Sequence, residues 1–321
     1  MNAKEIILTS RPQGTLTQDM FAVKDITLPE LKRDEVMLTP TYMSAQPFMP
    51  KGEKGVITSG GVAVVATSNS DVLKQGDKVM GVLPWATNSI LKAKELHKIE
   101  PTDVPDRYYA GLLGLPGMAA YFGFTDICDP RKGNTVVISG AAKPVGIITG
   151  QIAKIMGCHV VGITDSFEKE QLLSKKYGFE KVLNTQIIKN LSDAIAEACP
   201  KKVDCYFDTV GGEVTNAVIQ HLNLDARIAV CGQMSLYNDD LIGNAWQLVA
   251  ELAVHSGSIK GFLVTDYLKS YGIAIKELIH WMKNDGLHYQ ENIIKGFFKL
   301  PEAFMDLANG SSLEGLTVSI E

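Results

Sequence analysis

The pattern of hydrophobic and polar positions changes near residue 135, and this change divides the chain into two parts. Up to about residue 100, short β-branched runs alternate with turn residues, and no helical periodicity of convincing length is present. Such a pattern predicts a compact, largely antiparallel β unit. The runs that predict its strands include 35–41, 61–65 and 75–81.

From residue 135 onward, short strands that are apolar throughout alternate with helical patterns. Unbroken apolar strands separated by helices imply a parallel sheet that helices cover on both faces. We therefore predict an α/β fold, with a doubly wound parallel sheet in this part of the chain. Strands are expected at 135–139, 159–164, 203–208, 227–231 and 258–264, and helices at 145–156 and 168–177.

The end of the chain has a third pattern. Helices are expected at 272–282 and at 301–307, the second with Pro301 in its first turn, and a strand is expected at 316–320. A terminal strand that follows a completed α/β sheet can pair with an earlier domain. We expect this one to return to the β unit.

Composition narrows the class of protein. The chain has 321 residues, enough for two domains, with 45% hydrophobic and 21% charged residues and a formal net charge of -5. An acidic total without a block of Lys and Arg argues against a nucleic-acid partner. The start lacks a secretory signal, and the most apolar window, 108–124, is interrupted by glycines and Pro116. We therefore expect a cytoplasmic protein without a membrane span.

Cysteine and histidine spacing argues against several chemistries. The five cysteines are scattered without a C-x-x-C pair and the six histidines lie in no zinc-binding motif, so we expect no metal site. No G-x-S-x-G elbow or Walker lysine is present in the sequence. Among the reaction classes considered, hydride transfer by a bound cofactor is the one that remains. The protein would position a small-molecule substrate and polarise its carbonyl group.

The stretch VVISGAAKPVGIITGQIAK, 136–154, predicts the strand, tight turn and helix that hold a dinucleotide. A helix N-terminus there offers unpaired N–H groups and a partial positive charge to a pyrophosphate. Lys143 and Pro144 occupy the turn, where glycine is usual. Pro144 fits the first helical position but removes one donor, and the charge of Lys143 can compensate. The alternatives are a tight turn without a ligand and a Lys143 side chain that faces water.

The choice between NADH and NADPH depends on the stretch after the second strand, 162–169. Thr164 stands where an NAD-dependent enzyme usually has an acidic residue. Ser166 and Lys169 favour the 2′-phosphate of NADPH, whereas Asp165 repels that phosphate unless its side chain turns away. We therefore favour NADP(H) as the cofactor. Alternatively, Ser166 only caps the helix that follows.

A catalytic group is expected shortly after the strand at 227–231. Tyr237 follows this strand in the stretch CGQMSLYN, 231–238. A tyrosine hydroxyl is a neutral donor at pH 7 and can polarise a substrate carbonyl. The alternative is a half-buried loop tyrosine without a catalytic role.

These residues together resemble the zinc-independent branch of the medium-chain dehydrogenase/reductases. Within that branch they are most similar to the prostaglandin reductase/2-alkenal reductase group of NADPH-dependent enone reductases. The resemblance extends over nearly the whole chain. The blocks that carry it are 114–123, 136–154, 207–213, 227–238 and 260–264.

The resemblance implies a GroES-like domain at 1–112 that is completed by 286–321, a Rossmann domain at 113–285, and a homodimer. It implies that hydride passes from NADPH to the β-carbon of an α,β-unsaturated aldehyde or ketone and that a proton adds at the α-carbon. Tyr237 matches the tyrosine that orients the substrate carbonyl. The cofactor positions that it implies are Ala142, Lys143, Pro144, Val145 and Gly146 at the pyrophosphate, Lys169 at the 2′-phosphate, Cys231, Gly232, Phe262, Leu263 and Val264 at the nicotinamide half, and Thr209 and Ser312 where the family has asparagine. Ser166 is added from its place in the turn beside Lys169.

Several ligand-facing positions depart from the family pattern. These changes imply altered specificity or weaker cofactor binding. Quinone reduction and a catalytically weak nucleotide-binding protein are therefore alternatives. The sheet edge at 258–264 is a candidate seam between two copies of the chain. The departures are Lys143-Pro144 for Gly-Ala, Asp165 for glycine, Thr185 for tyrosine, Thr209 and Ser312 for asparagine, and Phe48 for tyrosine.

Overall fold

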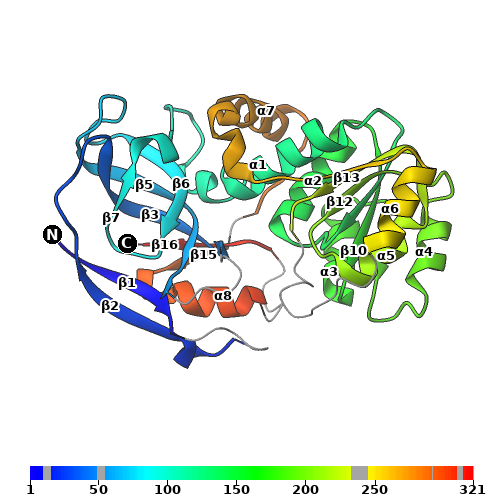
Figure 1. Cartoon of the computed structure of the whole chain (residues 1–321), viewed down its shortest axis with the longest axis horizontal. Coiled ribbons are helices and arrows are strands. Elements are labelled where there is room, and N and C mark those ends of the chain that lie inside the picture. The colour runs from blue at the N-terminus through cyan, green and yellow to red at the C-terminus, as the bar shows by residue number, and fades with distance from the viewer. Residues whose placement is uncertain (10–15, 49–54, 233–244, 291, 309–313, 321) are drawn as a thin grey trace. The chain divides into compact units, whose positions relative to one another are not determined.

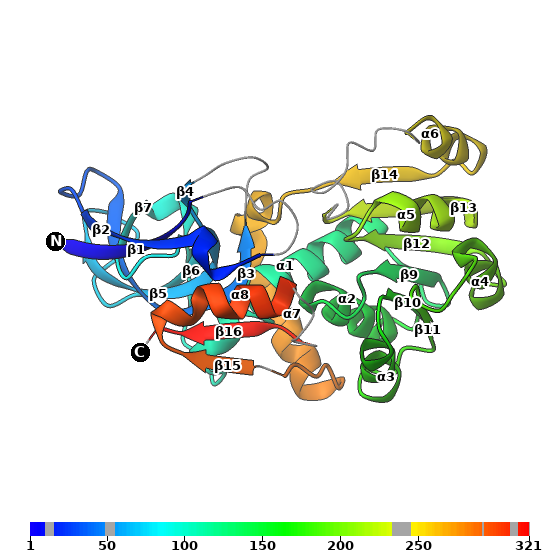
Figure 2. The same cartoon turned by 90° about the horizontal axis from the view of Figure 1, so that it is seen from below.

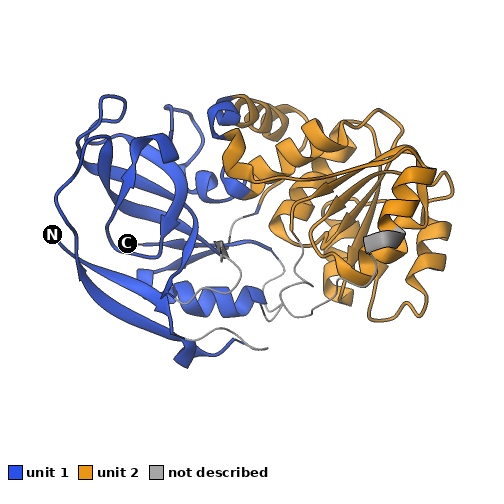
Figure 3. Cartoon of the chain, in the orientation of Figure 1, with its two compact units in different colours: residues 1–115, 268–272, 290–321 blue, residues 116–267, 273–289 orange. Residues whose placement is uncertain are grey.

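The computed structural model describes residues 1–9, 16–48, 55–232, 245–290, 292–308 and 314–320 (Figure 1). The chain forms two units, shown in different colours in Figure 3. Unit 1 comprises 1–115, 268–272 and 290–321, and unit 2 comprises 116–267 and 273–289. No helix within the described residues has the length and apolar character to cross a membrane.

A six-stranded parallel sheet forms the centre of unit 2. Its strand order is β11-β10-β9-β12-β13-β14, and Figure 2 shows these strands one above another in that order. All five residues of β9 are buried, because helices cover both faces of the sheet. The strands are β9 Thr135–Ser139, β10 His159–Thr164, β11 Lys181–Asn184, β12 Val203–Asp208, β13 Leu222–Val230 and β14 Ser258–Gly261.

Two sets of helices flank this sheet. Helices α2 and α3 contact β9, β10 and β11. Helix α5 packs between α4 and α6, and apolar residues of these three helices form a cluster with Val137, Val161 and Tyr206 of the sheet. The fold class predicted from the sequence, a doubly wound α/β domain beside a mainly-β domain, is confirmed. The helices are α1 Leu115–Phe122, α2 Pro144–Ile155, α3 Phe167–Lys175, α4 Leu191–Ala198, α5 Gly212–Ile219, α6 Ala245–Val254, α7 Tyr271–Asn284 and α8 Leu300–Ala308.

Unit 1 consists mainly of antiparallel strands. One sheet has the order β2-β1-β4 and the other the order β15-β16-β3-β5-β6-β8, with β7 also paired to β3. The C-terminal strand β16 pairs antiparallel with β3, with Val318 opposite Met43. The strands are β1 Asn2–Leu8, β2 Phe21–Thr27, β3 Glu35–Phe48, β4 Gly55–Val56, β5 Thr58–Ser68, β6 Lys78–Pro84, β7 Ser89–Lys92, β8 His97–Lys98, β15 Asn292–Lys295 and β16 Leu316–Ser319.

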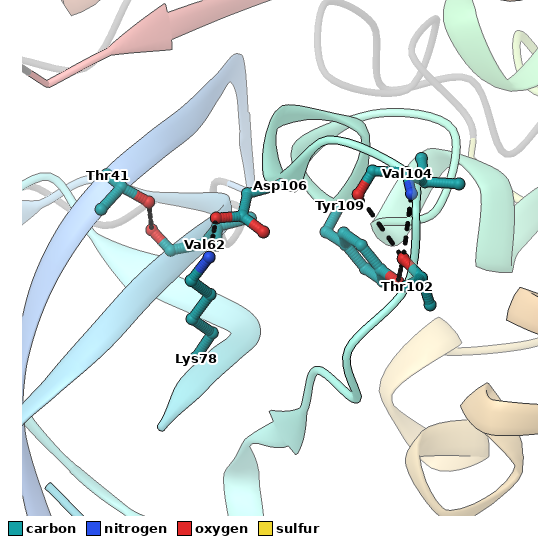
Figure 4. Close-up of polar contacts among 7 residues, drawn as sticks. All are labelled: Thr41, Val62, Lys78, Thr102, Val104, Asp106 and Tyr109. Atoms are coloured by element: carbon teal, nitrogen blue, oxygen red, sulfur yellow. Dashed lines mark hydrogen bonds and ion pairs between the residues drawn. The ribbon is translucent and has the colours of Figure 1, made fainter. Parts of the chain in front are cut away.

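Polar contacts hold the short 3₁₀ segment Asp106–Ala110 against the larger sheet of unit 1 and against the loop that precedes the segment (Figure 4). The Lys78 ammonium on β6 forms an ion pair with Asp106. The Thr102 and Tyr109 hydroxyl groups lie 3.1 Å apart, and burial raises the pKa of Tyr109, which keeps its hydroxyl protonated. These contacts fix the segment that leads out of the β unit toward α1.

Three of the differences from the sequence-based expectation concern the strands β3, β13 and β14. Strand β3 continues beyond residue 41 to Phe48, because register shifts, one of them between Met43 and Pro47, keep it paired with β5. Strand β13 begins at Leu222, where it pairs with Val203 of β12. Strand β14 ends at Gly261, and the chain then turns into the 3₁₀ segment Val264–Ser270. None of these differences changes the order of strands in the parallel sheet.

Candidate cofactor site

All six parallel strands of unit 2 end at one edge of the sheet, and the residues expected to bind a cofactor follow the ends of β9, β10, β12, β13 and β14. The register pairs Ser139 of β9 with Ile163 of β10, and Asp208 of β12 with Val230 of β13. The strand order reverses between β9 and β12, which are neighbours in the sheet. Doubly wound sheets bind ligands at such a reversal, outside the carboxyl ends of the strands.

The turn between β9 and α2 has the conformation of an anion-binding turn. Gly140 has φ +58°, a conformation that glycine adopts without strain. The Lys143 N–H donates to the Gly140 carbonyl oxygen at 3.0 Å, and Pro144 has no N–H to offer. The N–H groups of Val145 and Gly146 remain, because the first amides of an α-helix have no partner within it. Two amides therefore point out of the helix, fewer than in a turn without proline.

Glycine at position 146 allows helix α2 to approach this turn closely. A Cβ at Gly146 would lie 2.7 Å from the Gly140 carbonyl oxygen and 2.8 Å from the Ala141 Cα. A Cβ at Gly140 would lie 2.4 Å from the Thr209 hydroxyl oxygen. Ala142 is buried in the same turn. Residues larger than glycine therefore do not fit at positions 140 and 146. Small residues in such a turn allow the backbone to approach a pyrophosphate closely.

Lys143 is half-buried at the start of α2, so it is not a fully solvated surface lysine. Burial lowers the pKa of its ammonium group, and the nearby positive charge of Lys169 lowers it further. The carboxylate of Asp165 acts in the opposite direction. The three charged groups are thus close enough to influence one another, although they follow two different strands.

The turn after β10 holds an ion pair. Asp165 Oδ1 and Lys169 Nζ are 2.7 Å apart, and their side chains are 68% and 18% exposed, respectively. The Ser166 side-chain oxygen accepts a hydrogen bond from the Lys169 N–H at 3.3 Å and caps α3. Ser166 therefore acts as the helix cap, and its hydroxyl hydrogen can still be donated to another group. Thr164 is buried.

The carboxylate of Asp208, at the end of β12, is the centre of a buried hydrogen-bond network that the sequence did not indicate. Asp208 Oδ1 accepts from Ser139 Oγ at 2.8 Å, from the Tyr206 hydroxyl at 2.9 Å and from the Gly211 N–H at 2.9 Å. The Thr215 hydroxyl donates to Oδ2 at 2.8 Å. Burial raises the pKa of Tyr206 well above its usual range, so this tyrosine is a donor.

The same network joins the turns after β9 and β12. The Thr209 N–H donates to Ser139 Oγ at 2.8 Å, and the Thr209 hydroxyl donates to the Ser139 carbonyl oxygen at 2.8 Å. Both turns are therefore fixed relative to each other at the point where the strand order reverses. A polar residue at the end of an apolar strand was the available sequence signal, but its partners lie far away along the chain.

The residues expected near the nicotinamide follow β13 and β14. The Cys231 N–H donates to the Asp208 carbonyl oxygen at 2.8 Å, and burial raises the pKa of the Cys231 thiol to about 12. Gly232 follows directly. The Phe262 ring packs against the backbone of Gly123, because a Cβ added to Gly123 would lie 2.5 Å from this ring. Leu263 is 55% exposed and Val264 is buried.

Two expected residues, Tyr237 and Ser312, lie outside the described residues, so their roles stay predictions. In the part of the chain that the structure describes, no three His, Cys, Asp or Glu side chains gather as a metal site requires. The expectation of a metal-free site likewise stays a prediction.

Comparison with known proteins gives matches over nearly the whole chain. Residues 144–283 match the family of zinc-binding dehydrogenases, and residues 4–99 match the N-terminal domain of oxidoreductases. Prostaglandin reductase 1 of Bos taurus is 35% identical, with 98% of each chain covered. The NADP(+)-dependent 2-alkenal reductase of Nicotiana tabacum is 35% identical, covering 97% of this chain and 95% of that protein. The structure of CurA in complex with NADPH from Vibrio vulnificus has a TM-score of 0.85 and 29% identity over 99% of each chain.

Proposed function

This chain belongs to the medium-chain dehydrogenase/reductase superfamily and is an NADP-dependent oxidoreductase, and we propose that it reduces the C=C bond of α,β-unsaturated aldehydes or ketones. The cofactor-binding edge of the parallel sheet carries this proposal. It places a glycine-packed turn, two lysines and the ends of β13 and β14 along one edge. The names of the two most informative relatives, an alkenal reductase and a prostaglandin reductase, support the substrate class.

We infer that the pyrophosphate binds at the start of α2. The N–H groups of Val145 and Gly146 are the donors there, and the half-buried ammonium of Lys143 replaces the donor that Pro144 lacks. Ala142 and Pro144 form the apolar part of the turn. On the adenosine side, Lys169 and the Ser166 hydroxyl hydrogen are available to a 2′-phosphate.

We propose that the nicotinamide lies on the other side of the reversal point. The residues that border this position are Thr209, Cys231, Gly232, Phe262, Leu263, Val264 and Ser312. Because its raised pKa keeps Cys231 as a neutral thiol at pH 7, this residue adds no negative charge beside a negatively charged cofactor. When bound, NADPH supplies the hydride for the β-carbon of the substrate.

Tyr237 has the catalytic role in this proposal. Its hydroxyl donates a hydrogen bond to the substrate carbonyl and so stabilises the negative charge that develops on the oxygen. Phe48 stands where the family has a second tyrosine and has no hydroxyl to donate. We therefore assign the polarising role on the protein side to Tyr237, without a metal ion.

We also propose that two copies associate through β14. All four residues of this strand are exposed, and β14 stands at the end of the six-stranded sheet. Its far side offers backbone N–H and C=O groups that an identical strand can pair with around a twofold axis.

Calorimetric titration with NADPH and NADH, followed by a turnover screen with a 2-alkenal, an enone and a small quinone, tests the function. Gly146→Ala should abolish coenzyme binding, because its Cβ would lie 2.7 Å from backbone oxygen. Gly272→Ala, where nothing lies within 4 Å of the added Cβ, is the matched control. Absence of heat with both coenzymes would refute the cofactor site, and turnover of the quinone alone would refute the substrate class.

A further inference from the structure

We propose that Asp165 and Lys169 form a two-way recognition site for the 2′ position of the adenosine ribose. Asp165 accepts a hydrogen bond from the 2′-hydroxyl of NADH, whereas Lys169 binds the 2′-phosphate of NADPH in competition with Asp165. The protein therefore binds NADH as well as NADPH, and its preference for NADPH is smaller than Lys169 alone would give. This inference rests on the cofactor placement proposed above and adds a specificity-determining residue to it.

The position of Asp165 supports the first half of the proposal. It is the first residue after β10, which is the neighbour of β9 in the sheet. In dinucleotide-binding folds, an acidic side chain in this turn takes the ribose hydroxyl groups of NAD. Thr164, one residue earlier, is buried and uncharged. The Asp165 side chain is 68% exposed, so its carboxylate is accessible to a ligand.

The geometry of Lys169 supports the second half. Its side chain is only 18% exposed, and its backbone N–H is held by the Ser166 oxygen at 3.3 Å. The ammonium group is thus pre-positioned in the first turn of α3. The half-buried ammonium of Lys143 lies within electrostatic range of the same pair. Two lysines near one carboxylate favour an added phosphate even when Asp165 remains charged.

The ion pair couples the two halves. Asp165 Oδ1 is 2.7 Å from Lys169 Nζ, so a phosphate that binds Lys169 either displaces this carboxylate or takes the remaining N–H donors and lies beside it, and both arrangements cost binding free energy. A ribose hydroxyl needs no such exchange, because the carboxylate has further lone pairs for it. Exposed ion pairs of this kind contribute little stability, and opening one costs binding a factor of about five at most. The phosphate therefore binds, but with a reduced advantage over the hydroxyl.

A structural role is the competing explanation. An Asp and a Lys four residues apart can simply stabilise the first turn of a helix. In that case, removing Asp165 would change the affinities for both coenzymes by the same factor or leave both unchanged. The proposal instead requires opposite changes, which a helix-stabilising role cannot produce.

The test is calorimetric binding of NADPH, NADH, 2′,5′-ADP and 5′-AMP to the full chain. Asp165→Ala should bind NADPH and 2′,5′-ADP about three- to tenfold more tightly and NADH about threefold more weakly, with 5′-AMP following NADH. Lys169→Met should do the reverse, weakening NADPH and 2′,5′-ADP about tenfold or more and sparing NADH. Asp165→Asn repeats the NADPH measurement should the alanine variant fold poorly.

Asp25→Ala is the matched control. Asp25 Oδ1 lies 2.8 Å from Lys4 Nζ in unit 1, so this variant removes the same charge from a similar ion pair. It should leave all four affinities unchanged. Parallel changes for NADPH and NADH in Asp165→Ala would overturn the inference. The measurement is of binding, so it separates this inference from the proposed reaction. If the protein binds both coenzymes but reduces no enone, the proposed reaction is refuted and this inference stands. If it binds neither coenzyme, both are refuted.

Discussion

Removal of the Asp208 carboxylate should destabilise unit 2 far more than removal of another aspartate on the same strand. Asp208 is fully buried, whereas Asp204, also on β12, is half-buried. Asp204 accepts from the Thr135 N–H at 2.7 Å and from Asn223 Nδ2 at 2.9 Å. Asp208→Ala and Asp204→Ala therefore form a matched pair that differs in burial and in the number of donors left without an acceptor.

The expected magnitude follows from the partners that can pair again. After Asp208→Ala, the Tyr206 and Thr215 hydroxyls still lie 3.0 Å apart, and the Val210 N–H keeps Ser139 Oγ at 3.2 Å. The Ser139 hydroxyl and the Gly211 N–H lose their acceptor. One hydroxyl of the Tyr206–Thr215 pair also loses its acceptor, because only one of the two can donate to the other. Three buried donors at about 1 to 3 kcal/mol each give a loss of about 3 to 9 kcal/mol in the free energy of unfolding.

Asp204→Ala should cost about 1 to 2 kcal/mol, because water can reach its half-buried partners. Hydrogen exchange measured by mass spectrometry at increasing urea is the appropriate assay, since a chain with two units need not unfold in one step. Peptides from β9 and β12 report on unit 2, and peptides from β3 and β5 serve as an internal reference. Equal destabilisation by the two variants, within about 1 kcal/mol, would refute the reasoning from the buried network.

Three further predictions concern packing, catalysis and protonation. Gly150→Ala should destabilise the protein by about 1 to 3 kcal/mol in urea unfolding, because its Cβ would lie 2.0 Å from the Phe179 ring, whereas Gly272→Ala should not. Tyr237→Phe should lower enone kcat by about tenfold or more without changing NADPH affinity; an unchanged kcat would remove Tyr237 from catalysis. Burial lowers the Lys143 pKa and a bound phosphate raises it, so NADPH binding should take up protons at alkaline pH. Calorimetry in two buffers of different ionisation enthalpy should detect this uptake, and Lys143→Met should abolish it.

The centre of the parallel sheet was predictable because β9 and β10 consist almost entirely of apolar or β-branched residues, so the sequence shows them without knowledge of their neighbours. Strand β11 was not expected, because it has only four residues and a polar residue at each end. The turn after β9 was predictable for a related reason, since small residues and a proline mark it locally. The ion pair between Asp165 and Lys169 follows a spacing of four residues, which is also visible in the sequence. What these features have in common is that their partners are close along the chain.

The Asp208 network was not predictable in this way. Its hydrogen-bond partner Ser139 is 69 residues away, and neither residue belongs to a local motif that demands the other. The extension of β3 to Phe48 was missed because Pro47 argues against a central strand, whereas a register shift between Met43 and Pro47 keeps β3 paired with β5 here. Both features depend on which strands become neighbours, and the sequence pattern alone does not specify those contacts.

The pairing of β16 with β3 has a consequence for synthesis on the ribosome. The core of unit 1 contains Phe297, Leu300 and Val318 beside residues from the first half of the chain. Unit 2 can bury its sheet as soon as β14 and the segment 273–289 have emerged. The strands before residue 100 are made before unit 2 but need β16 to complete their own core, so the nascent chain completes the core of unit 2 before that of unit 1.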